Sequence, residues 1–289
     1  MLATATSYPA KVLLFGEHVL LRGGTGLSVP YPRLSLRWTR GETDERLLAF
    51  AEYLRGQFGP ELLDGDRLDN QLREGLRLTG NIPVGYGLGS SGAVCAAVWD
   101  RFATEEGKQM DGDLRRLRAL FARMEQHFHG KSSGTDPLIS YLGRGFILGN
   151  GVVTDADIAP THLSRFFLLD TGQPRSASPL IEDFLRRWDK DSDFQRKARR
   201  RWLEASRRAV WHTFDSVPEL FYEHFKTISN FQLKELPHFI PEAYRGVWDG
   251  GRAYRLKLCG AGGGGMLLGA AWERGVVERV FGEGGVWLV

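Results

Sequence analysis

Cysteine is scarce in this chain: only Cys95 and Cys259 occur among its 289 residues. Two cysteines are too few for a disulfide framework, and their apolar or glycine-rich surroundings predict buried, reduced thiols in a cytoplasmic protein. Long apolar runs are lacking too, because none approaches the roughly 18 residues of a membrane span. The first apolar stretch, Val12 to Phe15, lies between Lys11 and Gly16-Glu17-His18, so we expect no signal peptide. We therefore expect a soluble chain without a membrane partner.

An excess of one charge is also lacking. The chain has 38 basic and 35 acidic residues, for a formal net charge of +3. This balance gives no reason to expect a nucleic-acid partner, although it leaves room for an anionic ligand at a local site. At about 150 residues per domain the length predicts two domains. We place their boundary in the polar segment 154–164, giving domains 1–160 and 161–289.

Glycine is the residue in excess, at 36 of 289 positions, whereas its usual share is roughly 7%. Neither a collagen period nor a low-complexity tract accompanies it, so the glycines must be concentrated in discrete loops. Hydrophobic periodicity predicts strands and helices that alternate along the chain. The expected strands are 11–15, 27–38, segments of 138–153, 166–169 and 255–258, and the expected helices are 45–58, 91–104, 114–128 and most of 179–235.

The first glycine-rich loop, 83–91, leads into an alanine-rich helix expected to begin near Ser91. Glycines let a backbone approach a ligand closely, and the first N–H groups of a helix attract anions. The segment therefore predicts a phosphate site to which Ser90 and Ser91 add hydroxyls. An ordinary tight turn with either serine as the helix cap is the alternative.

Two better-known phosphate loops do not fit this segment. Residues 87–92 match G-x-G-x-x-G, but so do residues 260–265, which shows how permissive that pattern is. A dinucleotide-binding fold is disfavoured because Pro83 interrupts the approach to the loop and about eighty residues precede it. The P-loop of nucleotide-binding proteins needs Lys-Ser or Lys-Thr after its last glycine, whereas here Ala93 follows Gly92. A phosphate loop of a third kind is left.

Two carboxylates, Glu125 and Asp136, flank a predicted helix end near Gly130. One carboxylate that holds Mg²⁺ and one that orients a hydroxyl are what phosphoryl transfer to an alcohol requires. A solvated Glu125 and a turn residue at Asp136 form the alternative. His127 is expected to serve packing or to lie on the surface rather than to bind a metal.

Two further segments are candidates for ligand contact. Five glycines within 260–265 lose conformational entropy on folding, which suggests a second close approach of backbone to ligand. Glu17 and His18 follow a glycine at the end of a predicted strand, although such a pair is also common in purely structural positions.

In this order the motifs resemble those of the GHMP kinases, the family of galactokinase, homoserine kinase, mevalonate kinase and phosphomevalonate kinase. Within the family the segment from Glu125 to Asp136 and the run Asp170–Ser176 resemble the mevalonate kinases most. The matching segments are Lys11 through Gly16-Glu17-His18, Pro83 through Ser91, Glu125 with His129-Gly130, Ser133-Gly134 and Asp136, Asp170 through Ser176, and Gly260 through Gly265.

The resemblance implies an α+β fold of two domains, the first similar to ribosomal protein S5 domain 2 and the second ferredoxin-like, with ATP lying between them. It implies ATP and Mg²⁺ as cofactors and a small alcohol as substrate; a homodimer is left open. By motif position, Ser91 and Glu125 would bind Mg²⁺, Asp136 would take the proton of the acceptor hydroxyl, and Lys11 would stabilise the developing alkoxide. The residues that would contact the ATP phosphates are Gly85, Gly87, Leu88, Gly89, Ser90 and Ser91. The residues that would contact the acceptor are Glu17, His18, Gly262 and Gly263.

Departures from the motifs leave the acceptor more open than the reaction. Gly92 stands where the family usually has alanine, Ser132 where it has proline, and Pro137 where asparagine is common. Mevalonate is the expected acceptor, with a sugar, homoserine or phosphomevalonate as alternatives. A different class of function, a non-catalytic module that binds RNA or another anion, would rest on the basic run 196–208 around Trp202. A solvated helix face is the simpler interpretation of that run.

Overall fold

The computed structural model describes residues 6–175, 177–214 and 218–289. Ser176, the last residue of the motif that begins at Asp170, lies outside the described residues. The chain divides into two compact units that are interleaved along the sequence. Unit 1 consists of the residues up to Lys11, Pro30–Pro83 and Leu88–Arg144, and unit 2 of Val12–Val29, Val84–Gly87 and Gly145–Val289. The domain division at residue 160 stays a prediction.

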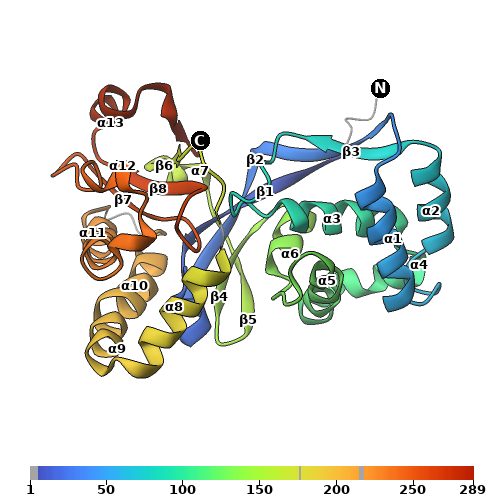
Figure 1. Ribbon diagram of the computed structural model, residues 1–289, viewed down its shortest axis with the longest axis horizontal. Helices are drawn as coiled ribbons and strands as arrows, with labels where there is room; N and C mark the ends of the chain where they lie inside the picture. Colours follow the sequence, from blue (N-terminus) through green and yellow to red (C-terminus); the bar gives the residue numbers. More distant parts are fainter. Residues whose placement is uncertain (1–5, 176, 215–217) are drawn as a thin grey trace. The chain divides into compact units, whose positions relative to one another are not determined.

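The described part of the chain contains strands, α-helices and short helical turns (Figure 1). The strands are β1 (Ser7–Phe15), β2 (Thr25–Arg40), β3 (Leu76–Gly80), β4 (Gly145–Gly149), β5 (Val152–Ala156), β6 (Phe166–Asp170), β7 (Tyr254–Leu258), β8 (Met266–Ala271) and β9 (Gly285–Trp287). The α-helices are α1 (Glu45–Gln57), α2 (Gly65–Arg73), α3 (Ser90–Phe102), α4 (Glu105–Lys108), α5 (Leu114–His129), α6 (Thr135–Leu142), α7 (Pro160–Leu163), α8 (Ala177–Lys190), α9 (Ser192–Ala198), α10 (Glu204–His212), α11 (Pro218–Glu235), α12 (Glu242–Arg245) and α13 (Arg274–Phe281). The short turns are η1 (Val19–Arg22), η2 (Gln109–Gly112), η3 (Arg199–Leu203), η4 (Pro237–Phe239) and η5 (Gly282–Gly284).

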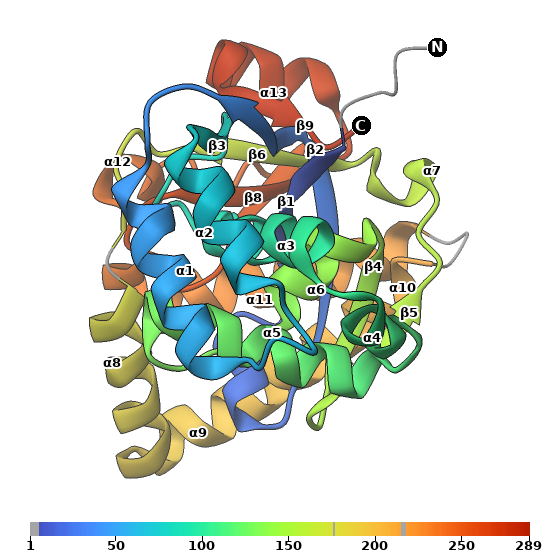
Figure 2. The ribbon, with the colours of Figure 1, turned by 90° about the vertical axis from the view of Figure 1, so that its right-hand side faces the viewer.

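In unit 1, helices pack on the second half of β2, which pairs with β3 in antiparallel register from Leu36 opposite Gly80 to Arg40 opposite Leu76. The indole N–H of Trp38 on β2 donates to the carbonyl of Ala97 on α3 at 3.3 Å. The same indole ring meets the Phe102 ring edge to face. Figure 2 shows α1 beside α2 and α5 beside α6, and α3 contacts both α5 and α6. The three helices α3, α5 and α6 are therefore packed on one another.

Helix α5 shows how local sequence fixes an element of the site. The Asp113 carboxylate caps its first turn by accepting from the N–H groups of Arg115 and Arg116. Gly130 ends the helix with a positive φ of 69°. The buried side chains of the helix are Leu117, Leu120, Phe121, Met124 and Glu125. A carboxylate thus occupies the face that otherwise serves the core.

Unit 2 is built on a four-stranded antiparallel sheet of order β7-β8-β6-β9. Helix α11 packs against β7 and α10 packs against α11, as Figure 1 shows. The Phe15 ring makes edge contacts with Phe166, Phe221 and Phe225, all buried. Strands β4 and β5 form a hairpin and are joined to the first half of β2. Packing of aromatic rings between sheet and helices therefore dominates this core.

Most of the expected elements are present, with one clear error. Strands at 11–15, 27–38, 166–169 and 255–258 are confirmed, as are helices at 45–58, 91–104, 114–128 and over most of 179–235. The prediction of strand for all apolar parts of 138–153 is wrong, because Leu138 to Leu142 belong to α6. A short apolar run fits a buried helix as well as a strand, and packing against α3 and α5 selects the helix.

Candidate active site

The phosphate loop meets α3 at Gly89, which is the N-cap and has a φ of 75°. The alternative in which Ser90 or Ser91 caps the helix is therefore wrong, since both lie within α3 and no side chain caps it. The Leu88 carbonyl accepts the backbone N–H of Lys11 at 2.9 Å. This bond ties the loop to β1. Because no side chain caps α3, its first N–H groups are available to bind an anion.

Lys11 and Asp136 form an ion pair beside this helix start. The Lys11 ammonium lies 3.0 Å from Asp136 Oδ2, with the lysine side chain 11% exposed and the aspartate side chain 33% exposed. A Cβ on Gly89 would lie 2.9 Å from Lys11 Cγ and 3.4 Å from Asp136 Oδ2. Glycine at position 89 therefore makes the space in which the pair meets the start of α3.

Asp136 occupies the first turn of α6 rather than a loop. Helix α6 packs tightly on α3, because a Cβ on Gly92 would lie 2.8 Å from both the Asp136 carbonyl carbon and the Pro137 nitrogen. This contact accounts for glycine where the family motif usually has alanine. The same close approach brings the Asp136 backbone onto the first turn of α3.

A second group of polar side chains, here called the serine–carboxylate cluster, consists of Ser91, Glu125, His129 and Ser132. Ser91 Oγ donates to Glu125 Oε1 at 2.9 Å and lies 2.9 Å from His129 Nε2. Because the hydroxyl proton goes to Glu125, His129 Nε2 is the donor to Ser91. Ser132 Oγ donates to the other oxygen, Glu125 Oε2, at 2.5 Å. Both oxygens of the buried carboxylate are thus bound by serines.

The environment of Glu125 makes its carboxyl group a weak acid. Burial is the main cause that raises its pKa to about 7, and the nearby Asp136 charge raises it further. Hydrogen bonds from Ser132 and Ser91, and the charge of Lys11, act in the opposite direction. The two carboxylates predicted from the sequence are therefore close enough for the charge of Asp136 to disfavour ionisation of Glu125.

Unit 2 contains Glu17 and His18, which the sequence assigns to the acceptor. The Glu17 carboxylate is fully buried, lies 2.8 Å from the Lys257 ammonium and accepts from the Gln232 amide at 2.8 Å. Burial raises the pKa of Glu17, while Lys257 opposes that change. Within the described residues Glu17 Oε2 finds no hydrogen-bond partner. Contact of Glu17 with an acceptor stays a prediction.

His18 is surrounded by aromatic rings of unit 2. Its ring lies 5.0 to 5.7 Å from the ring centres of Phe184, Trp202 and Phe239. Burial lowers the pKa of the imidazole to about 4, so it is neutral at pH 7, and Nε2–H donates to the Ala261 carbonyl at 3.0 Å. Its φ of 58° is rare for a residue other than glycine. His18 therefore joins the first motif to the glycine loop 260–265.

The glycine loop 260–265 is packed against other backbone segments of unit 2. Gly263 N–H donates to the Phe239 carbonyl at 2.7 Å, and Gly265 N–H donates to the Gln173 carbonyl at 2.8 Å. A Cβ on Gly262 would lie 2.7 Å from the Phe239 carbonyl oxygen. Close backbone packing thus explains several of these glycines, and a substrate contact at Gly262 and Gly263 stays a prediction.

The guanidinium of Arg175 lies against the Cα atoms of Gly87 and Gly260, where a side chain would collide with it. Its Nη1 donates to the Cys259 carbonyl at 3.2 Å, and its backbone N–H donates to the Gly85 carbonyl at 3.2 Å. Arg175 is half-buried. These contacts join the first part of the phosphate loop to the glycine loop within unit 2.

Comparison with known proteins agrees with these features. Residues 46–144 match the family model described as the GHMP kinases N terminal domain. This part of the chain is therefore similar to a GHMP kinase N-terminal domain. The mevalonate kinase of Archaeoglobus fulgidus is 25% identical over 274 residues, which cover 91% of this chain and 90% of that protein. The mevalonate kinase of Thermococcus gammatolerans is 29% identical over 171 residues, which cover 49% of this chain and 50% of that protein.

Solved structures share the fold. L. major mevalonate kinase in complex with R-mevalonate aligns with a TM-score of 0.60 at 16% identity, covering 98% of this chain and 91% of that chain. Streptococcus pneumoniae phosphomevalonate kinase in complex with phosphomevalonate and AMPPNP aligns with a TM-score of 0.65 at 14% identity, covering 99% and 98%. The expected GHMP fold and the class of small-molecule kinase that uses ATP are confirmed.

Several residues of this GHMP kinase fold escaped the prediction from sequence. Gln232 and Lys257 hold Glu17. Gln232 is far from any motif, and Lys257, which lies just before the glycine loop 260–265, could have drawn attention only as a lysine inside an apolar strand. His129 and Arg175 lie within the family motifs, but the resemblance assigns no role to either. Ser132 was noted only as a departure, although its hydroxyl bonds the Glu125 carboxylate.

The basic run 196–208 does not form an RNA-binding surface with an exposed aromatic residue. Trp202 is fully buried and packs on Phe184 and Phe231. Several basic side chains of the run are paired with Asp193 or Glu204 on the same helical segment. The solvated helix face is thus the better interpretation, and the non-catalytic anion-binding alternative loses its main support.

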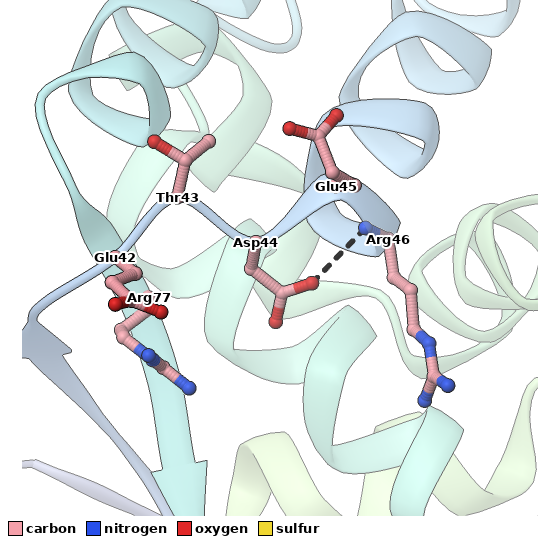
Figure 3. Close-up of a pocket in the computed structure, with 6 residues that line it drawn as sticks. All are labelled: Glu42, Thr43, Asp44, Glu45, Arg46 and Arg77. Carbon is pink, nitrogen blue, oxygen red and sulfur yellow. Dashed lines mark hydrogen bonds between the residues drawn. The ribbon is translucent and has the colours of Figure 1, made fainter.

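A shallow pocket of unit 1 lies at the start of α1 and is lined by Glu42, Thr43, Asp44, Glu45, Arg46 and Arg77 (Figure 3). The Asp44 carboxylate points to the Arg46 backbone N–H and caps the helix. The pocket therefore has a structural explanation.

Over the described ranges no cluster of three or more His, Cys, Asp or Glu side chains could hold a metal ion. No helix among the described residues is long and apolar enough to span a membrane.

Proposed function

We propose that this chain transfers the γ-phosphoryl group of ATP to the hydroxyl group of mevalonate. The observation that carries the proposal is the Lys11–Asp136 pair, 3.0 Å apart, at the glycine start of α3. An anion-binding helix start, a cation and a carboxylate are the groups that phosphoryl transfer to an alcohol needs at one place. Relatives named mevalonate kinase support the choice of acceptor.

Each group of unit 1 has a distinct role in this proposal. The first N–H groups of α3, with Gly89, Ser90 and Ser91, bind phosphate oxygens. Asp136 accepts the proton of the acceptor hydroxyl, and Lys11 compensates the negative charge that develops on its oxygen. Because the two side chains already contact each other, one hydroxyl placed against both would be oriented as well as activated.

The serine–carboxylate cluster fits Mg²⁺. Glu125 and Ser91 offer oxygen ligands 2.9 Å apart, and Mg²⁺ is typically bound by one or two carboxylates together with substrate phosphates rather than by a complete protein cage. The serine–carboxylate cluster therefore needs no third acidic ligand to bind Mg²⁺. When bound, Mg²⁺ would neutralise charge on the phosphates. Ser91 and Glu125 would hold it.

Unit 2, taken by itself, contains residues that the family resemblance assigns to the acceptor. Arg175 presents a cation between Gly87 and Gly260, which suits an acceptor that carries a carboxylate. Two buried polar atoms without a hydrogen-bond partner in the described chain, Glu17 Oε2 and His18 Nδ1, support the family assignment of these residues to a polar acceptor. The contact of Gly262 and Gly263 with the acceptor is proposed from the family resemblance alone.

An ADP-release assay across acceptors tests the proposal. Purified protein with ATP and Mg²⁺ is expected to release ADP with mevalonate and much less with phosphomevalonate, homoserine or a sugar. Preference for another acceptor would overturn the choice of mevalonate. Absence of acceptor-dependent ADP release with all of them would overturn the kinase itself and leave salt-dependent nucleic-acid binding to be measured.

The cellular location and the oligomeric state complete the proposal. A cytoplasmic location is supported by the scarcity of cysteine and by the burial of both thiols, Cys95 and Cys259. A homodimer stays open and is decided by light scattering on the purified protein.

A further inference from the structure

Ser132 lies on the loop between α5 and α6 and binds two different parts of unit 1. Its hydroxyl donates to Glu125 Oε2 at 2.5 Å and accepts the backbone N–H of Gly134 at 2.9 Å. A serine hydroxyl has one proton. Because the Gly134 N–H occupies its acceptor side, the proton is directed to the Glu125 carboxylate.

This hydrogen bond fixes the carboxylate in a way that Ser91 alone does not. Ser91 also contacts His129 and belongs to the part of α3 where phosphate and metal are proposed to bind, so its hydroxyl changes partners when they bind. Ser132 holds the far oxygen, Oε2, and leaves Oε1 on the Ser91 side. Rotation of the Glu125 carboxylate would break the bond to Ser132 whatever happens at Ser91.

The same serine is connected to Asp136. Gly134, whose N–H binds Ser132, is the N-cap of α6 with a φ of 70°, and it packs against the backbone of α5 at Arg118 and Ala122. Asp136 follows two residues later in the first turn of α6. A single hydroxyl therefore links the Glu125 carboxylate to the helix start that carries Asp136.

We propose that Ser132 is a positioning residue that orients the Glu125 carboxylate toward the metal and sets its spacing from Asp136. The proposal rests on the proposed function of Glu125 as a Mg²⁺ ligand. Ser132 does not touch the reacting atoms. It acts through Glu125, as residues behind a metal ligand commonly do, and their loss typically lowers metal affinity by about 10- to 100-fold.

The chain offers a matched control in the next residue. The Ser133 hydroxyl donates to Thr135 Oγ1 at 3.1 Å and accepts the Thr135 N–H at 3.3 Å. It thus supports the start of the same helix without a bond to Glu125. Ser133→Ala should perturb the loop about as much as Ser132→Ala but leave the Glu125 carboxylate oriented.

The experiment compares Mn²⁺ binding, detected by electron paramagnetic resonance in the presence of a non-hydrolysable ATP analogue. Ser132→Ala is expected to weaken Mn²⁺ binding by about tenfold, and Ser132→Thr, which keeps the hydroxyl, to restore most of it. Ser133→Ala should bind Mn²⁺ like the wild type. In turnover, Ser132→Ala should raise the Mg²⁺ concentration for half-maximal rate and lower kcat more than it raises the KM for ATP.

Equal Mn²⁺ affinity in the wild type and Ser132→Ala, or no binding by either, overturns the proposal, as does an equal loss in Ser133→Ala. If Ser132→Ala does not fold, Ser132→Cys provides a weaker donor of similar size and should give an intermediate affinity; unchanged affinity there overturns the proposal too. Mn²⁺ binding does not depend on the acceptor. A wrong acceptor, or failure of turnover with every acceptor, is therefore distinguishable from failure of the role of Ser132.

Discussion

The Lys11 ammonium lies 3.0 Å from the Asp136 carboxylate, at the glycine that begins α3. Lys11 comes from the middle of β1, and Asp136 comes from the first turn of α6, a helix that the sequence did not predict. Their pairing places a proton acceptor and a cation where an anion-binding helix start also lies. The following predictions depend on this arrangement and on the buried charges around it.

Removing the proton acceptor should abolish turnover. Asp136→Asn keeps the shape of the side chain but cannot accept the hydroxyl proton, so kcat should fall by about 10²- to 10⁴-fold. Binding of an ATP analogue, measured by calorimetry, should change little. Asp66→Asn is the control, because the Asp66 side chain is 92% exposed. Normal turnover in Asp136→Asn would contradict the assigned role.

Adding one methyl group between α3 and α6 should disturb Asp136. Gly92→Ala would place Cβ 2.8 Å from backbone atoms of Asp136 and Pro137, which have no side-chain freedom with which to move away. We expect a loss of about 1 to 3 kcal/mol in the free energy of unfolding and a lower kcat. Urea unfolding and the ADP assay measure both.

A glycine in open space provides the control for that substitution. A Cβ on Gly56, within α1, would meet nothing within 4 Å. Gly56→Ala should therefore stabilise the protein by about 0.5 to 1 kcal/mol and leave kcat unchanged. Equal stability changes for the two alanine variants would contradict the close packing of α3 on α6.

Ionisation of Glu125 should make the metal-free protein less stable as the pH rises. The carboxyl pKa is about 7 in the folded chain, whereas an unperturbed glutamate has a pKa of 4.5. Between these values the native state holds a proton that the unfolded state has lost. The contribution of this group to stability is therefore present below pH 4.5 and is lost as the pH rises through 7.

Glu125→Gln isolates that contribution. Without metal, the stability of the wild type relative to this variant should fall by at most about 3 kcal/mol between pH 4.5 and 8. Denaturant unfolding at a series of pH values measures the difference. A difference that does not vary with pH would contradict the raised pKa. Addition of MgATP should favour the wild type selectively, because the variant lacks the carboxylate ligand.

Substitutions in the buried ion pair of Glu17 and Lys257 should have non-additive effects on the free energy of unfolding. The side chains of Glu17 and Lys257 are both 0% exposed. Lys257→Met leaves the Glu17 charge without its cation, and we expect a loss of about 3 to 5 kcal/mol. Glu17→Gln combined with Lys257→Met should recover most of that loss. Additive effects in this double-mutant cycle, measured by urea unfolding, would contradict the pairing.

Short-range signals made much of unit 1 predictable. The glycines and serines of 85–91 indicated a loop that leads into a helix, and Gly130 marked the end of α5. Helix α6 was missed because its apolar run 138–142 is too short to show a helical period against a strand period. Its conformation is selected by contacts with α3 and α5, which no local pattern contains.

Unit 2 shows the same limit. The strand expected at 255–258 is present as β7, but the strand pattern gives Lys257 no partner. Helix α11 packs against β7 and supplies Gln232, and the lysine is buried against Glu17. Similarly, the basic run 196–208 left open whether Trp202 belongs to an anion-binding surface, and the burial of its indole in the core favours the simpler interpretation, a solvated helix face.

The sequence by itself determined the family resemblance, the phosphate loop, and the identities of Lys11, Glu125 and Asp136 as candidate groups, because these depend on residue types at fixed local spacing. Only the tertiary structure decided which of them touch. The Lys11–Asp136 pair, the Ser91–Glu125 hydrogen bond and the burial of Glu17 against Lys257 join residues far apart in the chain. The Ser132–Glu125 hydrogen bond crosses the loop that follows α5. Such contacts arise from packing between helices and strands, and packing also sets the burial that shifts the pKa of Glu125.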